Sequence, residues 1–63
     1  MLISLIAYKE VERNLQFLSL KESIKRFGLI EPIVVHNNTC IDGNKRICVY
    51  VDLGKKKIKA IEV

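Results

Sequence analysis

Two consecutive asparagines, Asn37 and Asn38, separate two short apolar runs in the middle of the chain. Asparagine tolerates the positive φ angles that both central residues of a two-residue type I′ turn require. The pair therefore predicts a tight hairpin whose antiparallel strands are Ile33–His36 and residues 39–41. Pro32 has no backbone N–H group to donate, so it fits the entry of the first strand. Any fold of this chain must accommodate an antiparallel hairpin at its centre.

A helix is predicted before the hairpin, because apolar residues recur there at steps of three and four and so form one stripe. The residues of this stripe are Phe17, Leu20, Ile24 and Phe27. Gly28 suits the left-handed position that commonly follows the last helical residue. Asn14 and Ser19 both have side chains that cap helix N-termini, so the first residue of the helix stays open between them.

A second helix is predicted after the hairpin, over residues 44–53, and Gly54 ends it. Apolar residues cover almost its whole circumference, which predicts a mostly buried helix: Ile47, Cys48, Val49, Tyr50, Val51 and Leu53. Residues 1–7, which are rich in Ile and Leu, and residues 58–63 are predicted as strands. The resulting order is β-α-β-β-α-β, an α+β fold with two helices packed on a short mixed sheet. We expect residues 1–63 to form a single domain.

The small size of the chain limits its stability and its location. A chain of 63 residues buries only about 60% of the surface that it exposes when unfolded, so it is marginally stable on its own. Its apolar runs are much shorter than the roughly 20 residues of a membrane span. No basic start or cleavage site of a signal peptide is visible, which predicts a cytoplasmic protein without a membrane partner. Cys40 and Cys48 fit no metal-site spacing, and we expect buried, unreactive thiols.

Four residues between the hairpin and the second helix, Gly43, Asn44, Lys45 and Arg46, form what we call the GNKR turn. Unpaired N–H groups and the helix dipole make a helix N-terminus favourable for an anion. The dipole disfavours Lys45 and Arg46 in the first helical turn by about 0.3–1 kcal/mol each, so their presence there suggests a phosphate ligand. Arg46 can donate two parallel hydrogen bonds to phosphate oxygens, whereas Lys45 acts as a point charge.

Other charged residues accompany the GNKR turn. Asp42 directly precedes it and either caps the second helix, which we favour, or orients Arg46 or a metal ion. The net charge is +4: residues 1–43 carry five basic and five acidic groups, and residues 44–63 carry six and two. This excess favours a polyanionic partner. Lys55, Lys56 and Lys57 are candidate contacts to a nucleic-acid backbone, although cations also suit the negative end of the preceding helix.

Five segments occur in an order and at spacings that resemble the ParB/sulfiredoxin superfamily. They are Ser23-Ile24, Gly28-Leu29-Ile30-Glu31-Pro32-Ile33-Val34-Val35, Ile41-Asp42-Gly43-Asn44-Lys45-Arg46, Leu53-Gly54 and Ile58-Lys59-Ala60-Ile61. The nearest likeness is to the ParB N-terminal domain, also called the ParB-like nuclease domain, over about residues 15–63. The resemblance implies that the GNKR turn is the family's G-x-x-R box. That box contacts the phosphates of CTP in ParB proteins, and the equivalent turn serves ATP in sulfiredoxin.

The sequence departs from the family pattern in two respects. Sulfiredoxin needs a cysteine within the box, where this chain has Asn44, and Cys40 lies on the preceding strand, so sulfinic acid reductase activity is not expected. Complete ParB proteins also contain a second phosphate-contacting segment, a DNA-reading helix-turn-helix and a dimerisation region. The 63 residues show none of these. Sequence-specific DNA reading and clamp loading, which need those parts, are not expected of these residues alone.

Three functions remain open. We favour a non-enzymatic module that binds nucleotide or nucleic-acid phosphate through the GNKR turn, in a DNA-related role. A second possibility is a Mg²⁺-dependent nuclease or nucleotide-dependent phosphotransferase, for which Asp42 and Glu31 are the available carboxylates near the turn. A third is a ligand-free interaction module, which docks a partner protein or a second copy through the lysines at 55–57 and unpaired strand edges.

Overall fold

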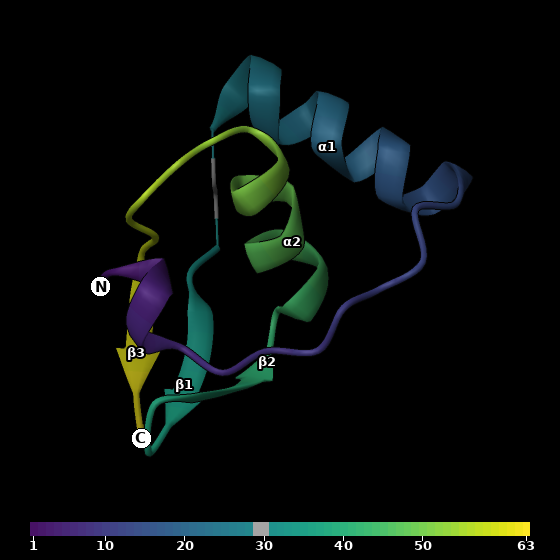
Figure 1. Ribbon diagram of the computed structural model, residues 1–63. Coiled ribbons are helices and arrows are strands. Elements are labelled where there is room, and N and C mark those ends of the chain that lie inside the picture. The colour runs from purple at the N-terminus through teal and green to yellow at the C-terminus, as the bar shows by residue number, and fades with distance from the viewer. Residues whose placement is uncertain (29–30) are drawn as a thin grey trace.

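The computed structural model describes residues 1–28 and 31–63. Its elements are a 3-10 turn (Ile3–Leu5), α1 (Leu15–Phe27), β1 (Ile33–His36), β2 (Thr39–Asp42), α2 (Asn44–Asp52) and β3 (Ala60–Glu62). The central strand β1 pairs antiparallel with β2 and parallel with β3. This arrangement confirms the predicted α+β class, with two helices packed on a small mixed sheet (Figure 1). Leu29 and Ile30 of the segment that resembles the family lie outside the described residues.

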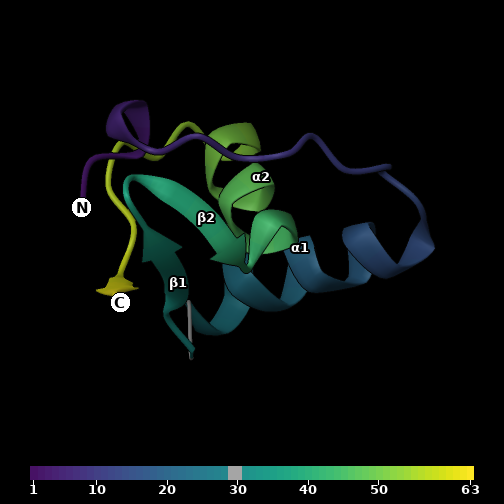
Figure 2. The ribbon, with the colours of Figure 1, turned by 90° about the horizontal axis from the view of Figure 1, so that it is seen from below.

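The hydrophobic core lies between the helices and one face of the sheet (Figure 2). Helix α2 contacts both β1 and α1, so it occupies the middle of the domain. The largest fully buried side chains are Phe17, Ile33, Val35, Ile47, Val49 and Cys48. Three of these belong to α2, but Val51 on the same helix is 38% exposed, so the second helix is buried on one side and not mostly buried as predicted. No polar or charged side chain is buried within residues 1–28 and 31–63.

The hairpin forms as the two asparagines predict. Asn37 and Asn38 have φ angles of 48° and 60°, which are the left-handed values of a type I′ turn. Val35 lies opposite Cys40, whereas Val34 lies opposite Asp42, so a β-bulge shifts the register between them. The bulge brings the end of β2 to the start of β1, where the GNKR turn begins.

Helix α1 begins after Asn14, whose side chain accepts a hydrogen bond from the N–H of Phe17 at 3.0 Å. Of the two possible caps, Asn14 is therefore the one used. Gly28 follows the helix with a φ of 80°, as predicted. Phe27 is the exception, because its side chain is 71% exposed and not part of the core. At 3.6 residues per turn it lies about 80° around the helix from Phe17, at the edge of the apolar stripe.

The predicted strand at residues 1–7 is wrong. Residues Ile3–Leu5 form a 3-10 turn, and pairing is limited to single bridges, Leu2 with Lys57 and Ala7 with Thr39. The reason is the spacing of the buried residues: Ile3 and Ile6 are 7% and 6% exposed and lie three residues apart. A strand would place them on opposite faces, whereas a 3-10 turn places them on the same side. The last strand, β3, is confirmed but shorter than residues 58–63.

Candidate functional site

The GNKR turn joins β2 to α2, and the glycine is required for two reasons. Gly43 is the N-cap of α2 and has a φ of 107°, which residues with a Cβ atom rarely adopt. A Cβ atom added at this position would lie 2.6 Å from Cγ2 of Ile33. The turn therefore packs its backbone directly against the start of β1, which fixes the position of the first turn of α2.

The N-terminus of α2 has no side-chain cap. No side chain accepts a hydrogen bond at the N-cap, and the first backbone bond of the helix runs from Ile47 N to Gly43 O. Within the described part of the chain, the N–H groups of Asn44, Lys45 and Arg46 consequently have no acceptor. These groups point out of the helix end together with the positive end of its dipole. The arrangement is suited to an anion.

The guanidinium group of Arg46 folds back over the turn toward the connection that enters β1. Its Nη1 donates to the carbonyl oxygen of Pro32 at 3.4 Å, and its Nη2 lies 3.3 Å from a carboxylate oxygen of Glu31. The side chain of Arg46 is 25% exposed and that of Glu31 is 75% exposed. The structure thus brings together Arg46 and Glu31, both predicted site residues, but as an ion pair.

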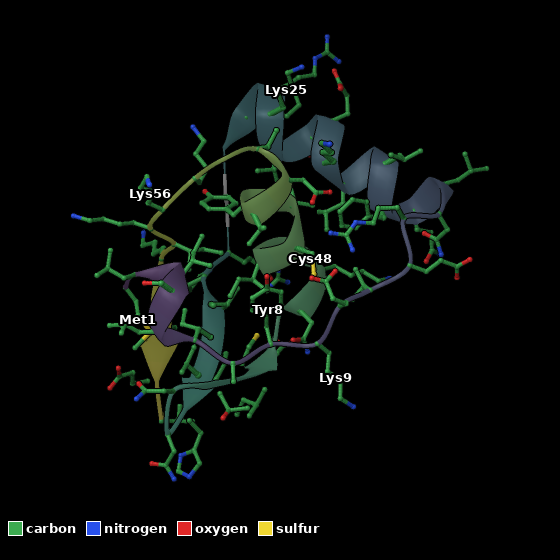
Figure 3. The ribbon with its side chains drawn as sticks, in the orientation of Figure 1. Met1, Tyr8, Lys9, Lys25, Cys48 and Lys56 are labelled. Atoms are coloured by element: carbon green, nitrogen blue, oxygen red, sulfur yellow. The ribbon has the colours of Figure 1, made fainter. Side chains whose placement is uncertain are left out.

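The other two GNKR side chains contact the N-terminal half of the molecule. The side-chain oxygen of Asn44 accepts a hydrogen bond from the N–H of Lys9 at 2.9 Å. The ammonium group of Lys45 lies 3.5 Å from the side-chain oxygen of Gln16, in the first turn of α1. The segment that leads from the 3-10 turn to α1 therefore passes beside the GNKR turn, and the side chain of Lys9 points away from the domain (Figure 3). These contacts join residues far apart in the chain, so no local sequence pattern predicts them.

A cleft of about 420 Å³ opens at the GNKR turn. All four residues of the turn line it, together with Asp42 and the apolar side chains of Val11, Leu20 and Ile41. Its lining combines the N–H groups of the turn, two cations and the carboxylate of Asp42 with three apolar side chains. This combination suits a ligand that carries a phosphate and an apolar or aromatic group.

The predicted cap by Asp42 is wrong. Asp42 is the last residue of β2 and pairs with Val34, so Gly43 takes the N-cap position after it. The carboxylate of Asp42 makes no hydrogen bond to Arg46, whose partners are Pro32 and Glu31. Within residues 1–28 and 31–63, no group of three or more His, Cys, Asp or Glu side chains could hold a metal ion. The alternative in which Asp42 orients Arg46 therefore has no support from this geometry.

Lys55, Lys56 and Lys57 lie at the opposite end of α2 from the GNKR turn. Six helical residues, 47–52, lie between Arg46 and the end of the helix, which at a rise of 1.5 Å per residue is a distance of about 9 Å. The three lysines follow the helix and precede β3, and the side chain of Lys56 extends away from the domain (Figure 3). The structure does not bring them into one site with Arg46.

Both cysteines are free and buried, as predicted. Burial away from water raises the pKa of the Cys40 thiol and of the Cys48 thiol. A raised pKa keeps a thiol protonated and unreactive at neutral pH. The Sγ atom of Cys48 lies 3.5 Å from the carbonyl oxygen of Lys9 and the Sγ atom of Cys40 lies 3.4 Å from that of Asp42. These contacts are typical of packed thiols.

Sequence reasoning missed Arg13, which connects three parts of the domain. Its guanidinium group donates two hydrogen bonds to the carboxylate of Asp52, at 2.9 and 3.3 Å, and one to Glu10 at 2.6 Å. It also lies 5.0 Å from the centre of the Phe17 ring. Arg13 therefore ties the segment before α1 to the last turn of α2. Arg13 and Asp52 are 39 residues apart. The sequence therefore shows only that their charges are opposite, and it does not indicate that they pair.

The Arg13–Asp52 pair predicts a pH-dependent contribution to stability. The hydrogen bonds that Arg13 donates to the Asp52 carboxyl hold the pKa of this group below its ordinary value of 3.8. A lowered pKa stabilises the folded state above the ordinary value, and this contribution is lost as the pH falls through the lowered pKa. We expect Asp52→Asn to lower the midpoint of thermal unfolding at neutral pH, and the difference from wild type to vanish in strong acid.

The control is Asp42→Asn, because the carboxylate of Asp42 forms no ion pair with the residues that the structure describes. Thermal unfolding of both variants and of wild type is followed by circular dichroism over the acid range. An Asp52→Asn effect that stayed constant down to strong acid would show that charge pairing with Arg13 is not its cause.

Comparison with known proteins supports the fold and supplies the family. The ParB N-terminal domain profile matches residues 7–63. A solved structure of a Pnob8-like ParB-N domain, in its C2221 form, is similar to this chain with a TM-score of 0.81 at 24% sequence identity. That likeness covers 98% of this chain and 27% of the other, so these 63 residues span about a quarter of the neighbour's length. The search of curated proteins gave no match. Since the profile spans nearly the whole chain, this protein belongs to the ParB N-terminal domain family.

Proposed function

We propose that this protein binds a phosphate-bearing ligand, a nucleotide or a nucleic-acid backbone, through the GNKR turn. The observation that carries the proposal is the uncapped N-terminus of α2, where three N–H groups have no acceptor among the described residues. Compared with a capping Ser, Thr, Asp or Asn, a glycine at the N-cap costs a helix about a few tenths of a kcal/mol, and it leaves these N–H groups without a side-chain acceptor. Phosphate oxygens would accept these hydrogen bonds and would also offset the unfavourable position of Lys45 and Arg46 relative to the dipole.

The surroundings of the turn support a nucleotide or a nucleic acid as the phosphate carrier. The cleft beside the turn has a volume of about 420 Å³, within the range of about 300–1,000 Å³ that small-molecule sites occupy. Its apolar side chains offer a surface for a sugar or a base. Membership of the ParB N-terminal domain family supports a DNA-related role. CTP and ATP are the nucleotides that we propose to test, together with duplex DNA.

Glu31 has a role in this proposal that differs from holding a metal ion. Its carboxylate lies 3.3 Å from the guanidinium group of Arg46 and is 75% exposed. A phosphate that binds Arg46 must displace this carboxylate or share the guanidinium group with it. We propose that Glu31 competes with the ligand for Arg46 and thereby weakens binding, because a second negative charge at this distance repels an incoming anion.

The substitution Arg46→Ala tests the site. We expect it to weaken binding of CTP, ATP or a short DNA duplex about tenfold or more, since a charge-assisted hydrogen bond contributes about 1.5–3 kcal/mol. Isothermal titration calorimetry measures the affinity. Arg26→Ala is the matched control, because it removes the same charge from an exposed position on α1. If none of the three ligands binds wild type, or if both variants bind equally well, the proposal is wrong.

In the same titration, Glu31→Gln shows whether Glu31 competes with the ligand for Arg46 or helps Arg46 to bind the ligand. Loss of the competing carboxylate is expected to raise the affinity about 1.5- to 5-fold, the range for an exposed ion pair. Glu22→Gln, at an exposed position of α1, changes the net charge equally and should have little effect. Weaker binding by Glu31→Gln would instead mean that Glu31 holds Arg46 in the orientation that the ligand needs.

A further inference from the structure

A second cleft, which we call the Leu2 groove, lies at the other end of α2. It forms where the N-terminal 3-10 turn meets the chain that follows the helix, and its volume is about 390 Å³. Figure 1 shows the purple N-terminal turn against the yellow-green segment after α2. The lining residues that matter here are Leu2, Val51, Gly54, Lys55 and Lys56.

The floor of the Leu2 groove is apolar and exposed. Leu2 and Val51 line the groove and are 42% and 38% exposed. The 3-10 turn buries Ile3 and Ile6 and leaves the side chains of Leu2 and Leu5 exposed. Exposed apolar side chains gathered around one concave site are typical of docking surfaces. A ligand that buries an apolar side chain on this surface removes apolar area from water, which is favourable.

Backbone hydrogen bonds hold the groove in shape. The N–H of Ile3 donates to the carbonyl oxygen of Lys56 at 3.0 Å, and Leu2 forms a β-bridge with Lys57. On the other wall, the N–H of Lys55 donates to the carbonyl oxygen of Tyr50 at 2.9 Å. A site that exists before its ligand arrives loses less conformational entropy on binding.

The rim of the groove is positively charged. Lys55 and Lys56 line it and Lys57 follows directly, and none of the three forms an ion pair within the part of the chain that the structure describes. The whole excess of positive charge, six basic against two acidic groups, lies in residues 44–63. The complement to an apolar floor with a cationic rim is an apolar side chain flanked by carboxylates.

We propose that the Leu2 groove docks a segment of a partner protein in which an apolar side chain is flanked by acidic residues. A nucleic-acid backbone would contact the lysines but would gain nothing from the apolar floor. A membrane surface favours an apolar face that protrudes, whereas this site is concave. The groove and the cleft at the GNKR turn lie at opposite ends of α2 and share no lining residue, so both sites can be occupied at once.

The test uses the full chain and a library of short peptides, each with one Leu or Phe between Asp and Glu residues. Peptides from this library are expected to bind, and amide resonances of Leu2, Val51, Lys55 and Lys56 are expected to shift in nitrogen–proton correlation NMR. The double variant K55E/K56E should weaken binding about tenfold, since it reverses both rim charges. The control K9E/K25E makes the same change in net charge at two exposed lysines outside the groove.

Three results would overturn the proposal. One is a library from which no peptide binds. Another is equal weakening by K9E/K25E and K55E/K56E, which would show attraction to net charge only. The third is binding of duplex DNA or of anionic phospholipid vesicles at the groove amides while the peptides do not bind there. Arg46→Ala should leave peptide binding unchanged, so failure of the phosphate site does not affect this test.

Discussion

Phe17→Ala is expected to abolish most of the stability of this domain. Phe17 has no exposed surface, and its ring is part of the hydrophobic core. Truncation of a buried phenylalanine typically costs about 3–5 kcal/mol. A chain of 63 residues has a total stability of roughly 3–9 kcal/mol, at about 0.05–0.15 kcal/mol per residue. Urea unfolding followed by circular dichroism should show a protein that is largely unfolded, or nearly so, without denaturant.

Phe27→Ala is the matched control, because it makes the same change on the same helix at a residue that is 71% exposed. We expect a loss of less than about 0.5 kcal/mol, which is usual for surface positions. The helical periodicity of the sequence alone predicts similar losses at both positions. Equal effects of the two substitutions would therefore contradict the packing of α1 that the structure shows.

Gly43→Ala is expected to have the second largest effect on stability. The φ of 107° disfavours any residue with a Cβ atom, which costs about 1–3 kcal/mol. The added atom would also lie 2.6 Å from Cγ2 and 3.0 Å from Cβ of Ile33, on a fully buried side chain that cannot move freely. Such overpacking costs about another 1–3 kcal/mol. The unfolding midpoint in urea measures the sum.

Gly54→Ala separates these two causes. Gly54 has a φ of 74°, but an added Cβ atom would find no heavy atom within 4 Å. Its loss of stability should therefore reflect the backbone strain alone and be the smaller of the two. A second check is Ile33→Ala in the Gly43→Ala background, which removes Cγ2, the atom in closest contact at 2.6 Å, so the two losses should not add. Equal effects of Gly43→Ala and Gly54→Ala would show that contact with Ile33 is unimportant.

The elements that local chemistry determines could be predicted from the sequence. The Asn37-Asn38 pair carries its own preference for positive φ, so the hairpin follows from two residues. The Asn14 cap, the glycine after α1 and the buried face of α2 also depend on short-range patterns. The GNKR turn was found for the same reason, because a glycine followed by two cations at a helix start is visible in the sequence.

The contacts that depend on packing between distant segments could not be predicted. Residues 1–7 have the composition of a strand, and only the core decides that Ile3 and Ile6 must face the same way. The bonds of Asn44 to Lys9 and of Arg13 to Asp52 join residues 35 and 39 positions apart, respectively. Asp42 was expected to cap α2, but the strand extends through it and leaves the cap to Gly43.

The part that most concerns function is the uncapped start of α2, and one measurement tests it directly. Amide resonances of the full chain are followed by nitrogen–proton correlation NMR while CTP, ATP or a short DNA duplex is added. If the GNKR turn binds phosphate, the amides of Asn44, Lys45 and Arg46 should show the largest saturable shifts with at least one ligand, and Arg46→Ala should abolish them. No saturable shift with any of the three, or shifts confined to the lysines at 55–57, would contradict phosphate binding at this turn.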